Sequence, residues 1–414
     1  MPDKTDSDQS KSVFSDVTNR VFPLFADINK LQKFVDSYLN HERYKHGFYF
    51  RASMPMVFME LLDYGSMGSK STGGATASQQ ELLFMVPLDW YEECKNGDHV
   101  FDGKSYKAHS TPQAIVTPFI FVDNPLSVMV GRDMFGWPKS LIAVQPTKDM
   151  WMPGPGSDSQ NVRIGAMRFA QLYQGEKKKF EITMEINRRA GISMGTASMP
   201  INFLSIASQW WSTWAQNYTD ILVQWKQLMS LDIGASAMAQ QMRDLYQLMM
   251  SGGGVTGHIP NGMFDHWSNS IGLKQFRYSD NPEDACYMAI ANSRSRVTAI
   301  RGMGMLGNIE SLMTSMDGGF SIRIHNYPAY PLVEKLGLVV SHTERKPDGM
   351  LIDVLKPCLP FWVTMDFNFE GCDPLATLVH AEPVPDNLGK DDLPCFALER
   401  NAVQPTSTGS AKHE

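Results

Sequence analysis

The chain has 414 residues, of which 43% are hydrophobic and 20% are charged, so it can bury a large core and is not disordered as a whole. The formal net charge is -7, and no basic block points to a nucleic acid as partner. No uninterrupted apolar run reaches the roughly 20 residues of a membrane-spanning helix, and the polar segment MPDKTDSDQSKS has no apolar stretch of a secretory signal. We therefore expect a cytoplasmic protein without a membrane span.

Cysteine usage argues against a disulfide framework. The five cysteines, Cys94, Cys286, Cys358, Cys372 and Cys395, are odd in number and show no C-x-x-C spacing. The ten histidines are dispersed and include no H-E-x-x-H pattern. We predict free thiols, no metal site and no cofactor.

The first predicted elements, after a disordered tail at residues 1–15, are a helix and a series of strands. INKLQKFVDSYLN, residues 28–40, places apolar residues at helical spacing. Strand-like runs follow at 54–65, 80–91, 112–124, 139–146, 162–173 and 178–187. Because most neighbouring runs have turn residues and no helix between them, the pattern favours an antiparallel sheet or barrel over βαβ units.

The pattern changes after Arg189. Residues 201–250 indicate two helices that break near 232–234, within a predicted helical insertion at 190–281. This insertion is either a helix hairpin packed on the sheet or, given its Trp and Met content, a lid or subunit contact. Strand-like runs resume at 286–291, 319–326, 337–344, 350–357 and 360–370. We thus predict one domain at 16–400 and a second disordered tail at 401–414.

One motif suggests a serine hydrolase. GISMG, residues 191–195, fits G-x-S-x-G and would place Ser193 on a nucleophile elbow. The preceding EINRRA is too polar for the central buried strand of an α/β-hydrolase, and the parallel alternation of that fold is missing. The hydrolase remains a less favoured alternative.

A lysine in GRDMFGWPKS is the stronger candidate for chemistry. A lysine that attacks a carbonyl must be neutral, whereas its unperturbed pKa is about 10.4. Lowering that pKa by roughly three units corresponds to about 4 kcal/mol, which burial among apolar groups or a nearby cation can supply. Phe135 and Trp137 give Lys139 apolar flanks, and Pro138 stiffens the backbone that presents it.

The segment FVDNPLSVMVGRDMFGWPKSLIAVQP, residues 121–146, resembles the signature of the acetoacetate decarboxylase superfamily. The similarity lies in a strand that ends in Asp-Asn, then Gly-Arg-Asp, then aromatic-Pro-Lys. Acetoacetate decarboxylase is an established example of an enzyme whose surroundings activate a lysine as a nucleophile. The resemblance implies that Lys139 forms a Schiff base with the substrate. It also implies an α+β fold, a curved antiparallel β-barrel or cone, here with a helical insertion.

The same resemblance suggests further site residues. Glu81, six positions before Pro87 in ELLFMVP, matches the family's catalytic glutamate. Arg20 and Arg132 are candidates to hold an anion of the substrate. The predicted site therefore consists of a catalytic pair, Lys139 and Glu81, and a substrate-binding set, Arg20, Arg132, Phe135 and Trp137.

The resemblance implies a lyase of the decarboxylase type that acts on a small keto acid or related carbonyl compound, as a homo-oligomer. Ser140 stands where decarboxylases of the family usually carry a second lysine. This departure leaves open a Schiff-base enzyme of the aldolase or dehydratase type. A lipocalin-like binder of an apolar ligand, which would use the same barrel without chemistry, is a further alternative.

Overall fold

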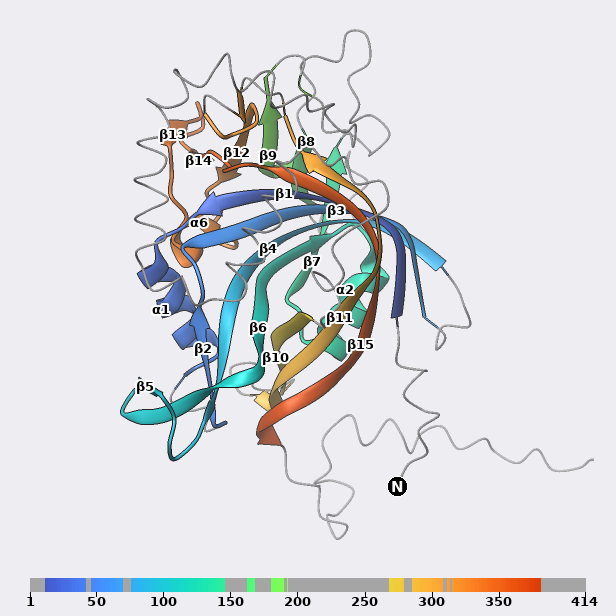
Figure 1. The fold of residues 1–414 in the computed structure, drawn as a ribbon. Coiled ribbons are helices and arrows are strands. Elements are labelled where there is room, and N and C mark those ends of the chain that lie inside the picture. Colours follow the sequence, from blue (N-terminus) through green and yellow to red (C-terminus); the bar gives the residue numbers. More distant parts are fainter. Residues whose placement is uncertain are drawn as a thin grey trace, which may run out of the picture.

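The computed structural model describes residues 12–41, 46–69, 76–145, 162–167, 180–189, 192, 268–278, 285–307, 311–312 and 315–380. In these ranges the protein is mostly β-sheet, and fifteen strands form one sheet that is accompanied by few helices (Figure 1). None of the helices in these ranges is both long and apolar enough to cross a membrane.

The elements follow one another along the chain. They are β1 (Ser12–Phe25), α1 (Ile28–Tyr38), β2 (Phe48–Ala52), β3 (Met56–Ser69), β4 (Thr76–Glu93), β5 (His99–Phe101), β6 (Lys104–Val122), α2 (Pro125–Phe135), β7 (Lys139–Gln145), β8 (Val162–Met167), β9 (Phe180–Arg188), β10 (Ser268–Arg277), β11 (Ala285–Met305), β12 (Phe320–His325), α6 (Leu332–Leu336), β13 (His342–Arg345), β14 (Leu351–Leu355) and β15 (Phe361–His380).

Pairing between the strands returns on itself. The path runs from β6 through β10, β11, β15, β1, β3 and β4, and β4 pairs with β6 again. Figure 1 shows the long strands of this path bending strongly along their length. From β6 the sheet also continues through β7, β8, β9, β12 and β14 to β13.

Most pairings are antiparallel, as the sequence predicted, but β6 has two parallel neighbours, β7 and β10. The first of these corrects the prediction, because α2 connects β6 to β7 and so forms a strand–helix–strand crossover. A helix between two strands returns the chain to the same end of the sheet, which makes the second strand parallel to the first.

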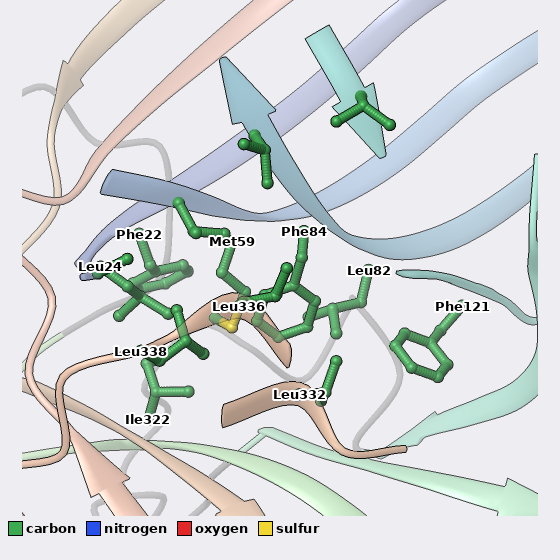
Figure 2. Close-up of a cluster of buried hydrophobic side chains, with 14 of the residues drawn as sticks. Phe22, Leu24, Met59, Leu82, Phe84, Phe121, Ile322, Leu332, Leu336 and Leu338 are labelled. Carbon is green, nitrogen blue, oxygen red and sulfur yellow. The ribbon is translucent and has the colours of Figure 1, made fainter. Parts of the chain in front are cut away.

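Alternation along β4 explains where the main core lies. Leu82, Phe84, Val86 and Leu88 recur at every second position and are all fully buried. Figure 2 shows Leu82 and Phe84 in a cluster with side chains from α6 and other strands, including Leu336. Each such burial contributes about 1.5–3 kcal/mol. Glu81, directly before Leu82, points to the opposite face.

The predicted helix near the start of the chain is confirmed as α1. Asp27 caps it by accepting hydrogen bonds from the backbone N–H groups of Asn29 and Lys30, at 2.9 and 3.2 Å. Leu31 and Val35, four residues apart, are fully buried in the main core. The helix therefore covers the core through the apolar face that its sequence predicts.

Part of the predicted organisation needs correction. β10 lies inside the range 190–281 that we predicted to be a helical insertion, and it is a strand whose alternate residues Ile271 and Leu273 join the main core. Ser12 to Ser15, which we placed in a disordered tail, belong to β1. In the range 190–281 the structure describes Ile192 and residues 268–278 only. Ser193 of the hydrolase motif and the tail at 401–414 lie outside the described residues.

The cysteines in the described ranges agree with the prediction of free thiols. Cys94, Cys286 and Cys358 are free, and burial raises the pKa of the Cys358 thiol to about 12. A thiol with so high a pKa is a poor nucleophile at neutral pH. Cys358 therefore acts as a small apolar residue of the core.

Candidate active site

Lys139 is the first residue of β7, and its side chain is buried, with only 5% of its surface exposed. Its Nζ donates a hydrogen bond to Glu81 Oε2 at 2.9 Å and a second to Ser127 Oγ, also at 2.9 Å. Glu81 is equally buried at 5%. The structure thus brings together the two residues that the sequence singled out as catalytic and adds a third polar group.

Strand register places the amine and the carboxylate on one face of the sheet. Glu81 lies opposite Val122 of β6, and Val122 lies opposite Leu141 of β7. Residues directly opposite in paired strands share a face, and so do residues two apart in one strand. Lys139, two positions before Leu141, therefore projects to the face of Glu81.

Two further side chains hold the Glu81 carboxylate. Tyr64 donates its hydroxyl to Oε1 at 3.1 Å, and Gln79 donates its amide to Oε2 at 2.8 Å. Burial, together with the negative charge of Glu81, raises the pKa of Tyr64 well above its ordinary value of 10.0. Tyr64 therefore stays a hydrogen-bond donor, and Glu81 has partners in addition to Lys139.

A second carboxyl group lies on the same face. Glu60 is two positions along β3 from Leu62, the residue opposite Glu81, and it accepts a hydrogen bond from Asn19 Nδ2 at 2.8 Å. Burial raises the pKa of Glu60 to about 7, against the lowering effect of the Asn19 bond and with a further rise from Glu81. Glu60 can therefore hold a proton near neutral pH.

The helix α2 presents one face to the lysine. Ser127, Gly131 and Phe135 are four residues apart and so lie in one row. A Cβ on Gly131 would lie 2.5 Å from Cδ of Lys139, which is too close for any side chain. Gly131 therefore gives the lysine side chain room to pass the helix and reach Glu81.

Local signals in the sequence fix both ends of α2. Asn124 accepts hydrogen bonds from the N–H groups of Leu126 and Ser127, at 3.0 and 3.3 Å, so it caps the helix and orients its first turn. Gly136 ends the helix at φ 70°, where a Cβ would also meet the backbone of Lys274 at 2.7 Å. These two caps position Ser127 and Phe135 relative to β7.

Aromatic rings form one side of the site. Phe135 stacks on Trp137 with ring centroids 4.5 Å apart, and Phe369 of β15 meets Trp137 edge-on at 5.2 Å. The Lys139 Nζ lies 5.2 Å from the Trp137 ring centroid. Phe135 and Trp137, both predicted site residues, thus lie beside the amine and supply the apolar surroundings that the sequence suggested.

The two predicted arginines are not brought to the amine. Arg20 follows Asn19 in β1 and so faces the opposite side of the sheet, where its Nη1 pairs with Asp63 Oδ2 at 2.8 Å. Arg132 lies in the last turn of α2 with an exposed side chain. Its charge there is favourable to the negative end of the helix dipole.

Ser127, Tyr64 and Gln79 were missed by the sequence reasoning. A signal was present for Ser127, because Asn124–Pro125 marks a helix start and Gly131 lies one turn after Ser127. Tyr64 gave no such signal, since its contact with Glu81 depends on the register between β3 and β4. Gln79 lies two residues before Glu81 in β4, so the alternation of that strand already places both side chains on one face. In the described ranges, no group of His, Cys, Asp and Glu could hold a metal ion.

No protein-family model matches the chain, and no curated protein sequence matches it. Among solved structures, the chain is similar to an acetoacetate decarboxylase from Legionella pneumophila, with 9% identity, a TM-score of 0.44, and 88% of this chain and 87% of that one covered. It is also similar to an acetoacetate decarboxylase-like enzyme from Sphingomonas wittichii, with 9% identity, a TM-score of 0.41 and coverages of 89% and 94%.

A third similar structure is the enduracididine biosynthesis enzyme MppR complexed with pyruvate, with 8% identity, a TM-score of 0.41 and coverages of 88% and 90%. The decarboxylase and decarboxylase-like structures carry the family name that the motif around Lys139 suggested. With identities this low and TM-scores below 0.5, they assign neither a reaction nor a residue to this chain. The function therefore has to be inferred from the contacts of Lys139.

Proposed function

We propose that this chain is an enzyme in which Lys139 forms a Schiff base with a keto acid or related carbonyl compound, most simply as a decarboxylase-type lyase. The observation that supports this is the buried Lys139 amine, held between the Glu81 carboxylate and the Ser127 hydroxyl at 2.9 Å each. Lysine side chains almost never lie buried without a partner, and here the partner is also a base that can take the proton.

The first step moves a proton within the Lys139–Glu81 pair. Glu81 Oε2 takes a proton from Nζ, and the nitrogen lone pair then attacks the substrate carbonyl carbon, so that a C–N bond forms and the C=O π bond breaks. Loss of water from the carbinolamine leaves an iminium on Lys139. The proton held by Glu81 leaves with the hydroxyl, which restores the carboxylate.

The iminium then accepts an electron pair from the substrate. With a β-keto acid, the C–C bond to the carboxylate breaks, carbon dioxide leaves and an enamine forms. Protonation of the enamine carbon and attack of water on the resulting iminium release a ketone and the free amine of Lys139. A neutral Glu60, which its raised pKa permits near pH 7, leaves one carboxylate rather than two facing the substrate.

Aromatic residues would orient the substrate. Trp137 and Phe135 lie beside the amine, and the indole Nε1 of Trp137 is a buried donor for which the described residues supply no acceptor. An unpaired buried donor is costly, so a substrate oxygen that accepts from Nε1 would gain affinity. Arg20 and Arg132 take no part in this mechanism, because their side chains lie away from the amine.

The closed path of paired strands supports this proposal. We propose that the closed path of seven paired strands forms the curved barrel or cone expected from the sequence, with Lys139 and Glu81 on its inner face. The homo-oligomeric state and the cytoplasmic location stay predictions.

The proposal is tested by borohydride trapping. The wild-type chain is incubated with acetoacetate, longer β-keto acids, pyruvate and apolar ketones or aldehydes, reduced, and mapped by peptide mass spectrometry. We expect a reduced adduct on Lys139 that disappears in Lys139→Ala and persists in Lys274→Ala, a matched control on β10, which like β7 pairs with β6. Carbonyl compounds that bind tightly and leave no adduct would contradict the Schiff base and favour a lipocalin-like binder.

A second measurement separates decarboxylation from the alternatives. Release of carbon dioxide from a β-keto acid that also traps on Lys139 supports the decarboxylase-type reaction. Trapping of a 2-oxo acid with an aldol or dehydration product, and no carbon dioxide, would favour the aldolase or dehydratase type instead.

A further inference from the structure

The hydroxyl of Ser127 is the second polar group on the Lys139 amine, and it comes from a different element than Glu81. Ser127 lies in the first turn of α2, its Oγ accepts from Nζ at 2.9 Å, and Glu81 in β4 accepts from the same Nζ. The amine therefore has one partner that is a base and one that is a neutral hydroxyl.

The Ser127 hydroxyl can donate as well as accept. A serine hydroxyl carries one hydrogen and two lone pairs, and the bond from Nζ uses only a lone pair. Among the described residues no acceptor is seen for its hydrogen, and the side chain is only partly buried. The hydrogen is thus free to point to an oxygen that arrives next to Nζ.

The position of Ser127 in α2 favours a negatively charged substrate oxygen next to its hydroxyl. Asn124 holds the backbone N–H of Ser127 at 3.3 Å, so the hydroxyl is fixed at the N-terminal end of α2. That end carries the positive part of the helix dipole, which stabilises an anion nearby. When an amine adds to a carbonyl, the carbonyl oxygen becomes such an anion, and it lies within hydrogen-bond reach of groups that contact the nitrogen.

We propose that Ser127 is a catalytic residue that relays a proton from Lys139 Nζ to the carbonyl oxygen of the substrate. This inference rests on the proposed Schiff-base function. As the C–N bond forms, the nitrogen becomes positive and the oxygen negative. The Nζ proton passes to Ser127 Oγ while the Ser127 hydroxyl hydrogen passes to the oxygen, which gives a neutral carbinolamine and an unchanged serine.

Ser140 provides a matched comparison within the chain. It follows Lys139 directly, yet it lies opposite Phe121, whose side chain is in the main core on the other face of the sheet. A serine adjacent in sequence to the lysine thus cannot serve the amine, whereas one twelve residues away does. This contrast separates a specific role of Ser127 from a general effect of removing a hydroxyl near β7.

The test uses 2,4-pentanedione, which condenses with a primary amine to an enaminone that absorbs in the near ultraviolet. The rate of this absorbance is measured by stopped flow for the wild type, Ser127→Thr, Ser127→Val and Ser140→Ala. Thr and Val have nearly the same shape, so both substitutions disturb the packing to a similar degree. A difference in rate between the two variants therefore reports the hydroxyl. We expect Ser127→Val to react about 10²-fold more slowly than Ser127→Thr, which is within the range of general acid–base catalysis, and Ser140→Ala to react close to the wild-type rate.

Each outcome decides between the two proposals. Equal rates for Ser127→Thr and Ser127→Val, with enaminone formed on Lys139, would overturn the role of Ser127 and leave the Schiff-base function intact. A slow Ser140→Ala variant would also contradict it, because the effect would not be specific to α2. Absence of any enaminone on Lys139 in the wild type would overturn the Schiff-base function and the relay with it.

Discussion

On one face of β1, β3 and β4, Arg20 pairs with Asp63 at 2.8 Å, beside the apolar core shown in Figure 2; on the other face, Lys139 pairs with Glu81 at 2.9 Å. Both pairs are buried. Arginine keeps its proton in proteins, so Arg20 stays charged and cannot become a nucleophile. Lysine can give its proton to a carboxylate, so the second pair can become neutral and expose a nucleophile.

The two buried carboxylates, Asp63 and Glu81, also differ in their other hydrogen-bond donors. Asp63 also accepts a hydrogen bond from Gln80, whereas Glu81 accepts hydrogen bonds from both Tyr64 and Gln79 in addition to Lys139. A buried ion pair is weak support for stability by itself. A buried ion pair can therefore serve catalysis only if the proton can pass from the cation to the carboxylate.

The largest expected difference between the faces is kinetic. Glu81→Gln removes the base, so enaminone formation from 2,4-pentanedione should slow by about 10²–10⁴-fold. Asp63→Asn makes the same isosteric change on the opposite face and should leave the rate unchanged. Stopped-flow absorbance measures both variants, and comparable slowing in the two would erase the distinction between the faces.

Stability should show the reverse order. Arg20→Met leaves Asp63 buried without its guanidinium, and we expect a loss of about 3–5 kcal/mol in the free energy of unfolding. Lys139→Met should lose less, because Glu81 keeps Tyr64 and Gln79 as donors. Urea denaturation of both variants provides the measurement. An equal or larger loss in Lys139→Met would contradict a mainly structural role for Arg20.

Glu60 gives the Lys139 face a pH dependence of its own. Its pKa is about 7 in the folded chain and ordinarily 4.5, so the folded state binds this proton more tightly. Its contribution to stability is therefore complete below about pH 4.5, falls as the pH rises to about 7 and stays low above that. In the wild type, the free energy of unfolding should decrease over this pH range by at most on the order of 3 kcal/mol because of Glu60, and Glu60→Gln should abolish this decrease.

The check is a series of urea denaturation curves between pH 4 and 8 for the wild type and Glu60→Gln. The two should differ in their pH slope within this window, with the variant more stable at the upper end. Parallel pH profiles would show that Glu60 ionises as freely in the folded chain as in the unfolded one.

The smallest expected effect compares the two capped helices. Asn124→Ala and Asp27→Ala each remove a side chain that accepts two backbone N–H bonds, and each should cost about 1 kcal/mol of stability. Only Asn124→Ala should also slow enaminone formation, because Asn124 orients the turn that carries Ser127. If Asp27→Ala slows enaminone formation equally, the slowing in Asn124→Ala comes from a general loss of stability and not from the orientation of Ser127.

The sequence predicted α1 and most strands from the spacing of their apolar residues, as at Leu31 and Val35 of α1. It did not predict α2, because the row of this helix that faces Lys139 includes Ser127 and Gly131, which are not large apolar residues, while Leu126 and Met129 are 60% and 62% exposed. A helix that packs against the Lys139 side chain thus lacks the usual apolar stripe.

The candidate site was predictable only in part for a similar reason. Lys139 and Glu81 were identified through a motif, and the structure brings them together. Arg20 is separated from Lys139 and Glu81 because side chains along β1 alternate between the two faces of the sheet. A shift of one residue would have placed Arg20 on the other face. Likewise, the contact of Tyr64 with Glu81 depends on pairing between β3 and β4, which composition does not reveal.

The hydrogen bonds to the amine have a consequence for how this chain can diversify. Lys139, Ser127 and Glu81, with the donors to Glu81, all come from residues 64–139, an unbroken part of the chain. No side chain after Arg189 takes part in these hydrogen bonds, although Lys274 and Phe369 pack against Gly136 and Trp137. On the proposed Schiff-base function, substitutions at later positions such as Phe369 would change the substrate, while Lys139 and its hydrogen-bond partners are inherited unchanged.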